Sequence, residues 1–190
     1  MKKLNLLLLT FISIMAFSGC TGNKNAGDAE VGQTPTTVDY ILAIADQEID
    51  KVVVVEGLCT HICSHGGKKL FLMGDDDSKT IRVESNDALG AFKSECVNSI
   101  VHVKGTLKEE RIDEAYLVKW ESQLAEGTAE VHGDGEEGCE TEQKAQGQDN
   151  VTTEAGRIKD FRSKIAARNE AEGKDYLSFY YIEADAYSII

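Results

Sequence analysis

The sequence predicts a mainly β protein with α additions, in which a five-stranded Greek-key barrel carries flanking helices and a C-terminal strand. Three observations support this fold class. Short segments rich in β-branched residues occupy the middle of the chain, and glycine and aspartate turns separate them. Helical spacing of apolar residues occurs before, between and after these segments. The 190 residues suit one domain with appendages better than two full domains.

The N-terminal segment, residues 1–19, is expected to be a signal peptide. Two lysines precede an apolar stretch, Leu4–Phe17, that is short for a membrane span, and small residues mark a cleavage site before Cys20. This segment resembles the lipobox of bacterial lipoproteins, although Phe17 stands where an aliphatic residue is usual. The resemblance implies that the Cys20 thiol is acylated, so that lipid anchors the chain on a membrane without spanning it.

Residues 20–37 are expected to be a lipidated flexible tether, because they hold mostly small and polar residues. The expected location is the bacterial cell envelope, on the outer membrane. The formal net charge of −13 argues against a nucleic-acid partner, since binding a polyanion requires a basic face. The expected partners are the membrane, through the lipid anchor, and an envelope protein or oligosaccharide.

The barrel elements follow from spacing and turn signals. An amphipathic helix capped by Thr36 or Thr37 is expected to place Val38, Ile41, Leu42 and Ala45 on the domain as a lid. The β-branched run Val52–Val55 favours an extended strand. The five strands are expected at Lys51–Ile62, Lys69–Met73, Thr80–Glu84, Ser99–Leu107 and Tyr116–Trp120, with a short helix at Asp87–Val97.

This order of three strands, a helix and two strands is the order of the OB-fold. Residues 38–120 resemble the OB-fold domains of small lipoproteins from Bacteroidota-like bacteria. The likeness is carried by Val55-Glu56-Gly57, the turn Cys63–Lys69, Phe71-Leu72, Val103-Lys104-Gly105 and Glu109–Asp113. It implies a fold and a compartment, but little chemistry, because most such lipoproteins have no assigned activity.

Two further segments follow the predicted barrel. Residues 121–150 hold nine acidic residues against Lys144 alone, so they are expected to be an acidic mobile loop. Residues 151–190 are expected to form a helix, capped by Thr152 and ended by Gly173, and a C-terminal strand from Tyr176. The helix is expected to bury Ile158, Phe161 and Ile165 and to leave Arg157, Lys159, Arg162 and Lys164 outside.

A candidate metal site lies at the end of the first strand, where thiols and imidazoles alternate. Thiolate and imidazole suit a zinc, copper or iron ion better than calcium or magnesium. The side chains of Cys59, His61, Cys63 and His65 cannot all reach one ion from a straight strand. The favoured pair is therefore Cys63 and His65, beside the Gly66-Gly67 turn. The additional candidate ligands are His61 and Cys59 and, from the acidic loop, Cys139 and His132.

The cysteines also have structural interpretations. Four cysteines allow three disulfide pairings, among which the sequence does not choose. Cys59 and Cys96 also fit as small core side chains, since free cysteine is among the most buried residue types.

A second candidate site is a ligand-binding surface formed by Lys68, Lys69, Tyr116 and Trp120, because OB surfaces use aromatic rings for stacking. The sequence contains no catalytic triad order, phosphate-binding glycine loop or specific carboxylate pair, so no enzyme activity is expected. Two functions stay open: an anchored ligand-binding protein with a soft metal at Cys63 and His65, or a non-catalytic OB-type module that binds a protein or oligosaccharide.

Overall fold

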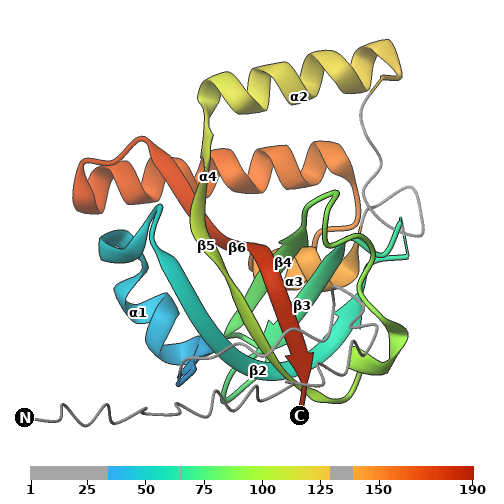
Figure 1. The fold of residues 1–190 in the computed structure, drawn as a ribbon. Coiled ribbons are helices and arrows are strands. Elements are labelled where there is room, and N and C mark those ends of the chain that lie inside the picture. Colours follow the sequence, from blue (N-terminus) through green and yellow to red (C-terminus); the bar gives the residue numbers. More distant parts are fainter. Residues whose placement is uncertain (1–33, 65, 129–138) are drawn as a thin grey trace, which may run out of the picture.

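The computed structural model describes residues 34–64, 66–128 and 139–190, and a closed barrel forms its centre (Figure 1). The barrel strands are β2 (Val52–Ile62), β3 (Lys69–Met73), β4 (Thr80–Ser85), β5 (Ile100–Asp113) and β6 (Tyr176–Ile189). They pair in the order β2-β3-β4-β6-β5, and β5 pairs again with β2, which closes the barrel. A short strand, β1 (Thr36–Thr37), joins β2 in parallel.

The connectivity of these strands is that of the OB-fold. Strands β2, β3 and β4 form a consecutive antiparallel meander, and β5 returns to pair antiparallel with β2. Strand β6 then lies between β5 and β4, parallel to β4. This is a five-stranded Greek-key barrel, so the predicted fold class is confirmed. The first four predicted strands are all present, and the fourth extends to Asp113.

The fifth predicted strand is wrong, because Tyr116–Trp120 lies in a helix, α2 (Glu114–Glu126). Asp113 caps this helix, its carboxylate accepting a hydrogen bond of 2.8 Å from the Tyr116 amide. The apolar side chains Leu117, Trp120 and Leu124 repeat at helical spacing and contact one small core. The C-terminal strand β6 takes the fifth place in the barrel instead.

The expected N-terminal helix is confirmed as α1 (Val38–Glu48), and the Thr37 hydroxyl accepts a hydrogen bond from the Tyr40 amide. Its buried residues Val38, Ile41 and Ala45 belong to the barrel core. The helix expected at Asp87–Val97 is wrong, since only a 3-10 turn, η2 (Ser94–Cys96), forms there. Gly90 adopts a left-handed conformation (φ +72°), which interrupts a helix at its middle.

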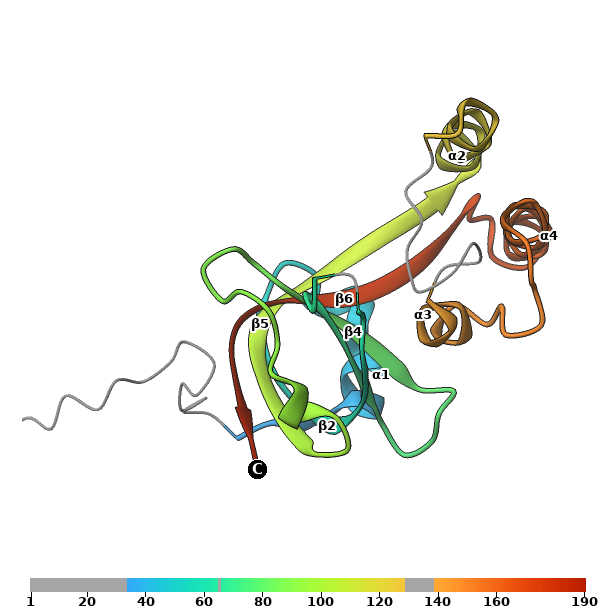
Figure 2. The ribbon, with the colours of Figure 1, turned by 90° about the vertical axis from the view of Figure 1, so that its right-hand side faces the viewer.

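Strands β5 and β6 continue beyond the barrel as a two-stranded ribbon, which carries α2 and α4 (Glu154–Glu172) at its far end (Figure 2). The pairing runs from Val101 opposite Ile189 to Asp113 opposite Tyr176, with a bulge between Lys104 and Gly105. A second, smaller core fills the space between the ribbon and the two helices. Its buried residues are Ile112, Leu117, Ile158 and Phe161.

The acidic segment 121–150 is not a loop throughout. Residues 121–126 complete α2, and α3 (Glu140–Ala145) follows later, so the prediction is wrong for those residues. Residues 129–138 lie outside the described part of the chain. The expected signal peptide and tether, apart from residues 34–37, also lie outside it.

The C-terminal helix is confirmed, with two corrections. Thr153, and not Thr152, caps α4, and Gly173 ends it in a left-handed conformation. Arg157 is buried instead of exposed, because polar groups from the preceding segment surround it. Within the described ranges, none of the helices is both long and apolar enough to cross a bilayer.

Candidate functional site

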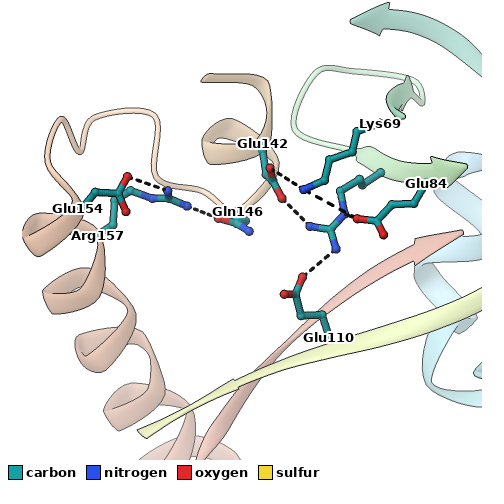
Figure 3. Close-up of polar contacts among 8 residues, drawn as sticks. Lys69, Glu84, Glu110, Glu142, Gln146, Glu154 and Arg157 are labelled. Atoms are coloured by element: carbon teal, nitrogen blue, oxygen red, sulfur yellow. Dashed lines mark hydrogen bonds and ion pairs between the residues drawn. The ribbon is translucent and has the colours of Figure 1, made fainter. Parts of the chain in front are cut away.

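The candidate site is a cavity of about 490 Å³ between the barrel and the helices α2, α3 and α4. Strands β3, β4, β5 and β6 supply its barrel side, and the three helices supply the opposite side. Lys69 and Arg82 lie on the strands, Glu142 on α3 and Arg157 on α4. Figure 3 shows two groups of polar side chains, one around Glu142 and one around Arg157. Gln146 lies between the two groups and accepts a hydrogen bond from Arg157.

Arg82 is the centre of the first group. Its side chain is 13% exposed, and it pairs with Glu142 at 2.5 Å, with Glu110 at 2.8 Å and with Glu84 at 3.1 Å. Burial disfavours the charged guanidinium, but the three carboxylates outweigh burial and raise the pKa of Arg82 above its ordinary value. Lys69 adds a second cation, 3.6 Å from Glu142.

Arg157 is the centre of the second group. Its guanidinium donates hydrogen bonds of 2.9 Å to Gln148 and 2.8 Å to Gln146, and it lies 3.5 Å from the Glu154 carboxylate. The same guanidinium lies over the Trp120 ring, 5.1 Å from its centroid. These contacts explain how a charged residue of α4 is buried, because acceptors meet its nitrogen atoms and an aromatic ring covers one face of the group.

Aromatic rings form one side of the cavity. Tyr116 meets Trp120 edge to face, with 6.2 Å between ring centroids. Burial raises the pKa of the Tyr116 hydroxyl, and the nearby carboxylates of Glu110 and Glu142 raise it further. Tyr181 lies across the cavity under the Arg82 guanidinium, 4.9 Å from ring centroid to carbon.

The charges around the cavity nearly cancel. The cationic residues among its lining are Lys69, Arg82, Lys119 and Arg157, and the anionic residues are Glu84, Glu109, Glu110, Glu142 and Glu154. Four positive and five negative groups leave a formal charge of −1. Such a cavity offers fixed donors and acceptors without a strong field of one sign.

A smaller cavity of about 220 Å³ lies on the other side of the Arg82–Glu142 ion pair. Leu42, Phe71 and Phe179 give it an apolar side. Arg82, Glu142 and Gln146 border both cavities, so the ion pair forms part of the partition between them.

Three of the four residues of the expected ligand surface meet at the large cavity: Lys69, Tyr116 and Trp120 all border it. Lys68 does not border it, and pairs with the exposed Asp87 at 2.8 Å. Sequence reasoning missed Arg82, Arg157 and Glu142. Arg82 alternates with the apolar Ile81 and Val83, a pattern typical of a polar side chain on the face of a strand away from the core, so the local sequence carries no sign that its charge is buried.

The candidate metal ligands separate into two places. Cys59 is fully buried in the barrel core, and its thiol donates to the His61 carbonyl at 3.7 Å. The His61 ring lies beside Phe71 at 5.9 Å. Across the described ranges, no cluster of three or more His, Cys, Asp or Glu side chains suits a metal ion. Cys20, His65 and His132 lie outside the described residues.

The cysteines form two neighbouring pairs. Burial raises the pKa of Cys59 to about 12, and the nearby Cys96 raises it further. Burial likewise raises the pKa of Cys139, and the nearby Cys63 adds to this effect. The four cysteines of the described residues are all buried, and no disulfide joins any two of them. The expectation that Cys59 and Cys96 occupy the core is confirmed.

Comparisons with known proteins add little beyond this geometry. No family model and no curated protein matches the chain. An aspartyl-tRNA synthetase from Entamoeba histolytica has a similar structure over 86% of this chain and 44% of its own, with TM-score 0.33 and 11% identity. A Leishmania major protein assigned as an aspartyl-tRNA synthetase matches 43% of this chain and 17% of its own, with TM-score 0.28 and 17% identity. This chain therefore spans less than half the length of either of these two structures, and the OB-fold assignment rests on strand order.

Proposed function

We propose that this protein is a lipid-anchored envelope protein that binds a polyhydroxylated, saccharide-type ligand, without catalysis, in the cavity between the barrel and helices α2–α4. The observation that carries the proposal is the combination of aromatic rings with paired donors and acceptors around one cavity of about 490 Å³. Most small-molecule sites are concave, with a few fixed polar groups that orient the ligand.

The chemistry of the lining matches such a ligand in three respects. A sugar has apolar C–H faces, for which Trp120 and Tyr116 offer rings. Its hydroxyl groups both donate and accept, so they can use carboxylates such as Glu110 and cations such as Lys119 together. The near-zero charge of the lining favours a neutral ligand over a polyanion, whose binding requires an excess of cations.

The location in the envelope is supported by the sequence of residues 1–20, in which an apolar stretch precedes small residues and Cys20. An anchored binding module would keep its ligand at the membrane surface. Metabolic labelling with a fatty acid tests this part, since the Cys20→Ser variant should lose the label.

Binding is tested by calorimetry with the purified protein and neutral oligosaccharides, after an array has selected the best one. Trp120→Ala should weaken binding at least about 10-fold, which corresponds to about 1.4 kcal/mol. Lys68→Ala is the control and should leave the affinity unchanged, because Lys68 lies outside the cavity although its neighbour Lys69 borders it. Equal affinities of the wild type and Trp120→Ala, with both folded by circular dichroism, would refute the site. Binding of single-stranded nucleic acid instead would refute the ligand class.

A soft metal ion bound through Cys63 and His65 is the second candidate function. The observation that favours it is that Cys139, one of the additional predicted ligands, is a neighbour of Cys63. Elemental analysis of the purified protein should then give one zinc, copper or iron per chain, and Cys63→Ser should remove it. Substoichiometric metal in both proteins would reject this candidate.

A further inference from the structure

The smaller cavity, of about 220 Å³, lies between the two hydrophobic cores of the protein. Leu42 of α1 and Tyr180 of β6 line this cavity and pack against the barrel core. Phe179, the neighbour of Tyr180 on β6, also lines it but packs against the small core beside α2 and α4. The cavity is therefore located at the junction of the two cores, and neither core fills it.

The walls of this cavity are mostly apolar. The partly buried side chains of Leu42, Phe179 and Tyr180 and the fully buried Phe71 line it. A cavity of about 150 Å³ with apolar walls holds a benzene molecule. The volume of about 220 Å³ therefore has room for one six-membered ring with a small substituent.

The hydroxyl groups of the three serine and threonine residues around the cavity already have partners in the protein. The Ser78 hydroxyl donates to the Asp76 carboxylate, and the Thr80 hydroxyl donates to a backbone carbonyl of the same turn at 3.3 Å. The Ser178 hydroxyl accepts a hydrogen bond of 3.3 Å from Arg168. A ligand gains little here from donors or acceptors of its own, because it has to compete with these bonds.

The charged side chains of the lining are also paired. Arg82 and Glu142 form their ion pair at 2.5 Å. The Tyr180 hydroxyl donates to the Asp46 carboxylate, and burial together with this hydrogen bond raises the pKa of Tyr180 to about 12. A charged ligand would lose its water shell in this cavity without an unpaired partner of opposite charge. The lining therefore selects an uncharged molecule.

We propose that the smaller cavity is a second ligand site, which binds an uncharged monocyclic aromatic molecule. The rings of Phe179 and Tyr180 favour an aromatic ligand over an aliphatic one of equal size, because aromatic pairs gain from edge-to-face and offset contacts. Ala145, the last residue of α3, borders this cavity and not the larger one. The bound ring would thus contact α1, the barrel and α3 together.

The test uses benzyl alcohol, which is uncharged and soluble enough for an NMR titration of the purified protein. Its Kd should be on the order of 1 mM, which is within the range for a ligand of its size. Benzoate, which adds a charge, and cyclohexylmethanol, which lacks the aromatic ring, should each bind at least about 10-fold more weakly. Equal affinity for benzoate would refute the preference for uncharged molecules, and equal affinity for cyclohexylmethanol would refute the aromatic class.

A variant that fills the cavity tests the location of the site. Ala145→Leu should weaken the binding of benzyl alcohol at least about 10-fold, because the larger side chain takes up the space of the ring. Ala167→Leu is the matched control, since Ala167 is exposed on α4 and borders neither cavity. Unchanged affinity of Ala145→Leu, with both variants folded by circular dichroism, would overturn the proposal.

A second measurement on the wild-type protein keeps the proposal testable if Ala145→Leu fails to fold. In a two-dimensional amide NMR spectrum, benzyl alcohol should shift the signals of Leu42, Ala145 and Phe179 most strongly. Shifts concentrated elsewhere would overturn the proposal. The titration contains no saccharide, so failure of saccharide binding in the larger cavity would leave this second site unaffected.

Discussion

The Arg82 guanidinium of β4 and the Glu142 carboxylate of α3 form an ion pair of 2.5 Å between the barrel and the helical layer. Both side chains are largely buried, at 13% and 12% exposure. The pair separates the two cavities and also borders both of them. This ion pair therefore contributes both to the stability of the fold and to the shape of the candidate site.

Replacing Arg82 should be strongly destabilising. Arg82→Met leaves three carboxylates without their cation, so the free energy of unfolding should fall by about 3 kcal/mol. Urea denaturation measures this loss. Arg162→Met is the matched control, since Arg162 joins Glu114 and Glu121 at a more exposed position and should cost less than about 1 kcal/mol. Equal losses for the two variants would contradict the central place given to Arg82.

Gly105 should not accept a side chain. Gly105 lies within the barrel, paired with Val53 of β2 on one side and Ala184 of β6 on the other, and a Cβ there would lie 2.2 Å from the Glu183 carbonyl oxygen and 2.8 Å from the Ala184 α-carbon. Both are backbone atoms, so Gly105→Ala should cost more than about 2 kcal/mol or prevent folding. Gly127→Ala meets no atom within 4 Å and should cost about 1 kcal/mol, from its positive φ alone. Thermal unfolding compares them.

Thr153, and not Thr152, should control the start of α4. The Thr153 hydroxyl accepts a hydrogen bond of 3.1 Å from the Gly156 amide. Thr153→Ala should therefore lower the free energy of unfolding by about 1 kcal/mol. The neighbouring Thr152→Ala should leave it within about 0.5 kcal/mol of the wild type. The reverse order of the two effects in denaturant titrations would show that the helix begins one residue earlier.

The buried Cys59 thiol should make stability fall at high pH. Its ordinary pKa near 9 applies to the unfolded chain, and burial raises the folded value to about 12. The folded state therefore holds this proton more tightly. The stabilisation is complete below pH 9 and is lost between pH 9 and 12, by at most about 1.4 kcal/mol per pH unit. Cys59→Ala should be less stable than the wild type at pH 7 but should show a flatter decline from pH 9 to 11.

The elements that could be predicted from the sequence are those whose apolar spacing, caps and turns lie within a few neighbouring residues. Strand β3 occurs over the predicted residues, because its apolar run lies between two strong turns. Tyr116–Trp120 was wrongly predicted as a strand because four of its five residues are apolar or aromatic. The aspartate cap at Asp113 and the spacing of Leu117, Trp120 and Leu124 would have indicated a helix.

The candidate site was harder to predict, since its polar groups meet only through tertiary structure. Lys69, Tyr116 and Trp120 were found because lysine and aromatic side chains suggested a binding surface. Arg157 was placed outside, as the charged face of an amphipathic helix usually is. Its partners Gln146 and Gln148 come from a segment without periodicity, and nothing in the local pattern brings them to α4.

Strand β6 occupies residues 176–189, yet it fills the gap between β4 and β5. A nascent chain therefore cannot complete its barrel while the ribosome is still translating the residues before Tyr176. Until then β4 and β5 each expose an unpaired edge, which is a site for aggregation. A premature stop codon in the α4 region would leave such an open sheet permanently, so cellular proteases should remove truncated products much faster than point variants of the surface.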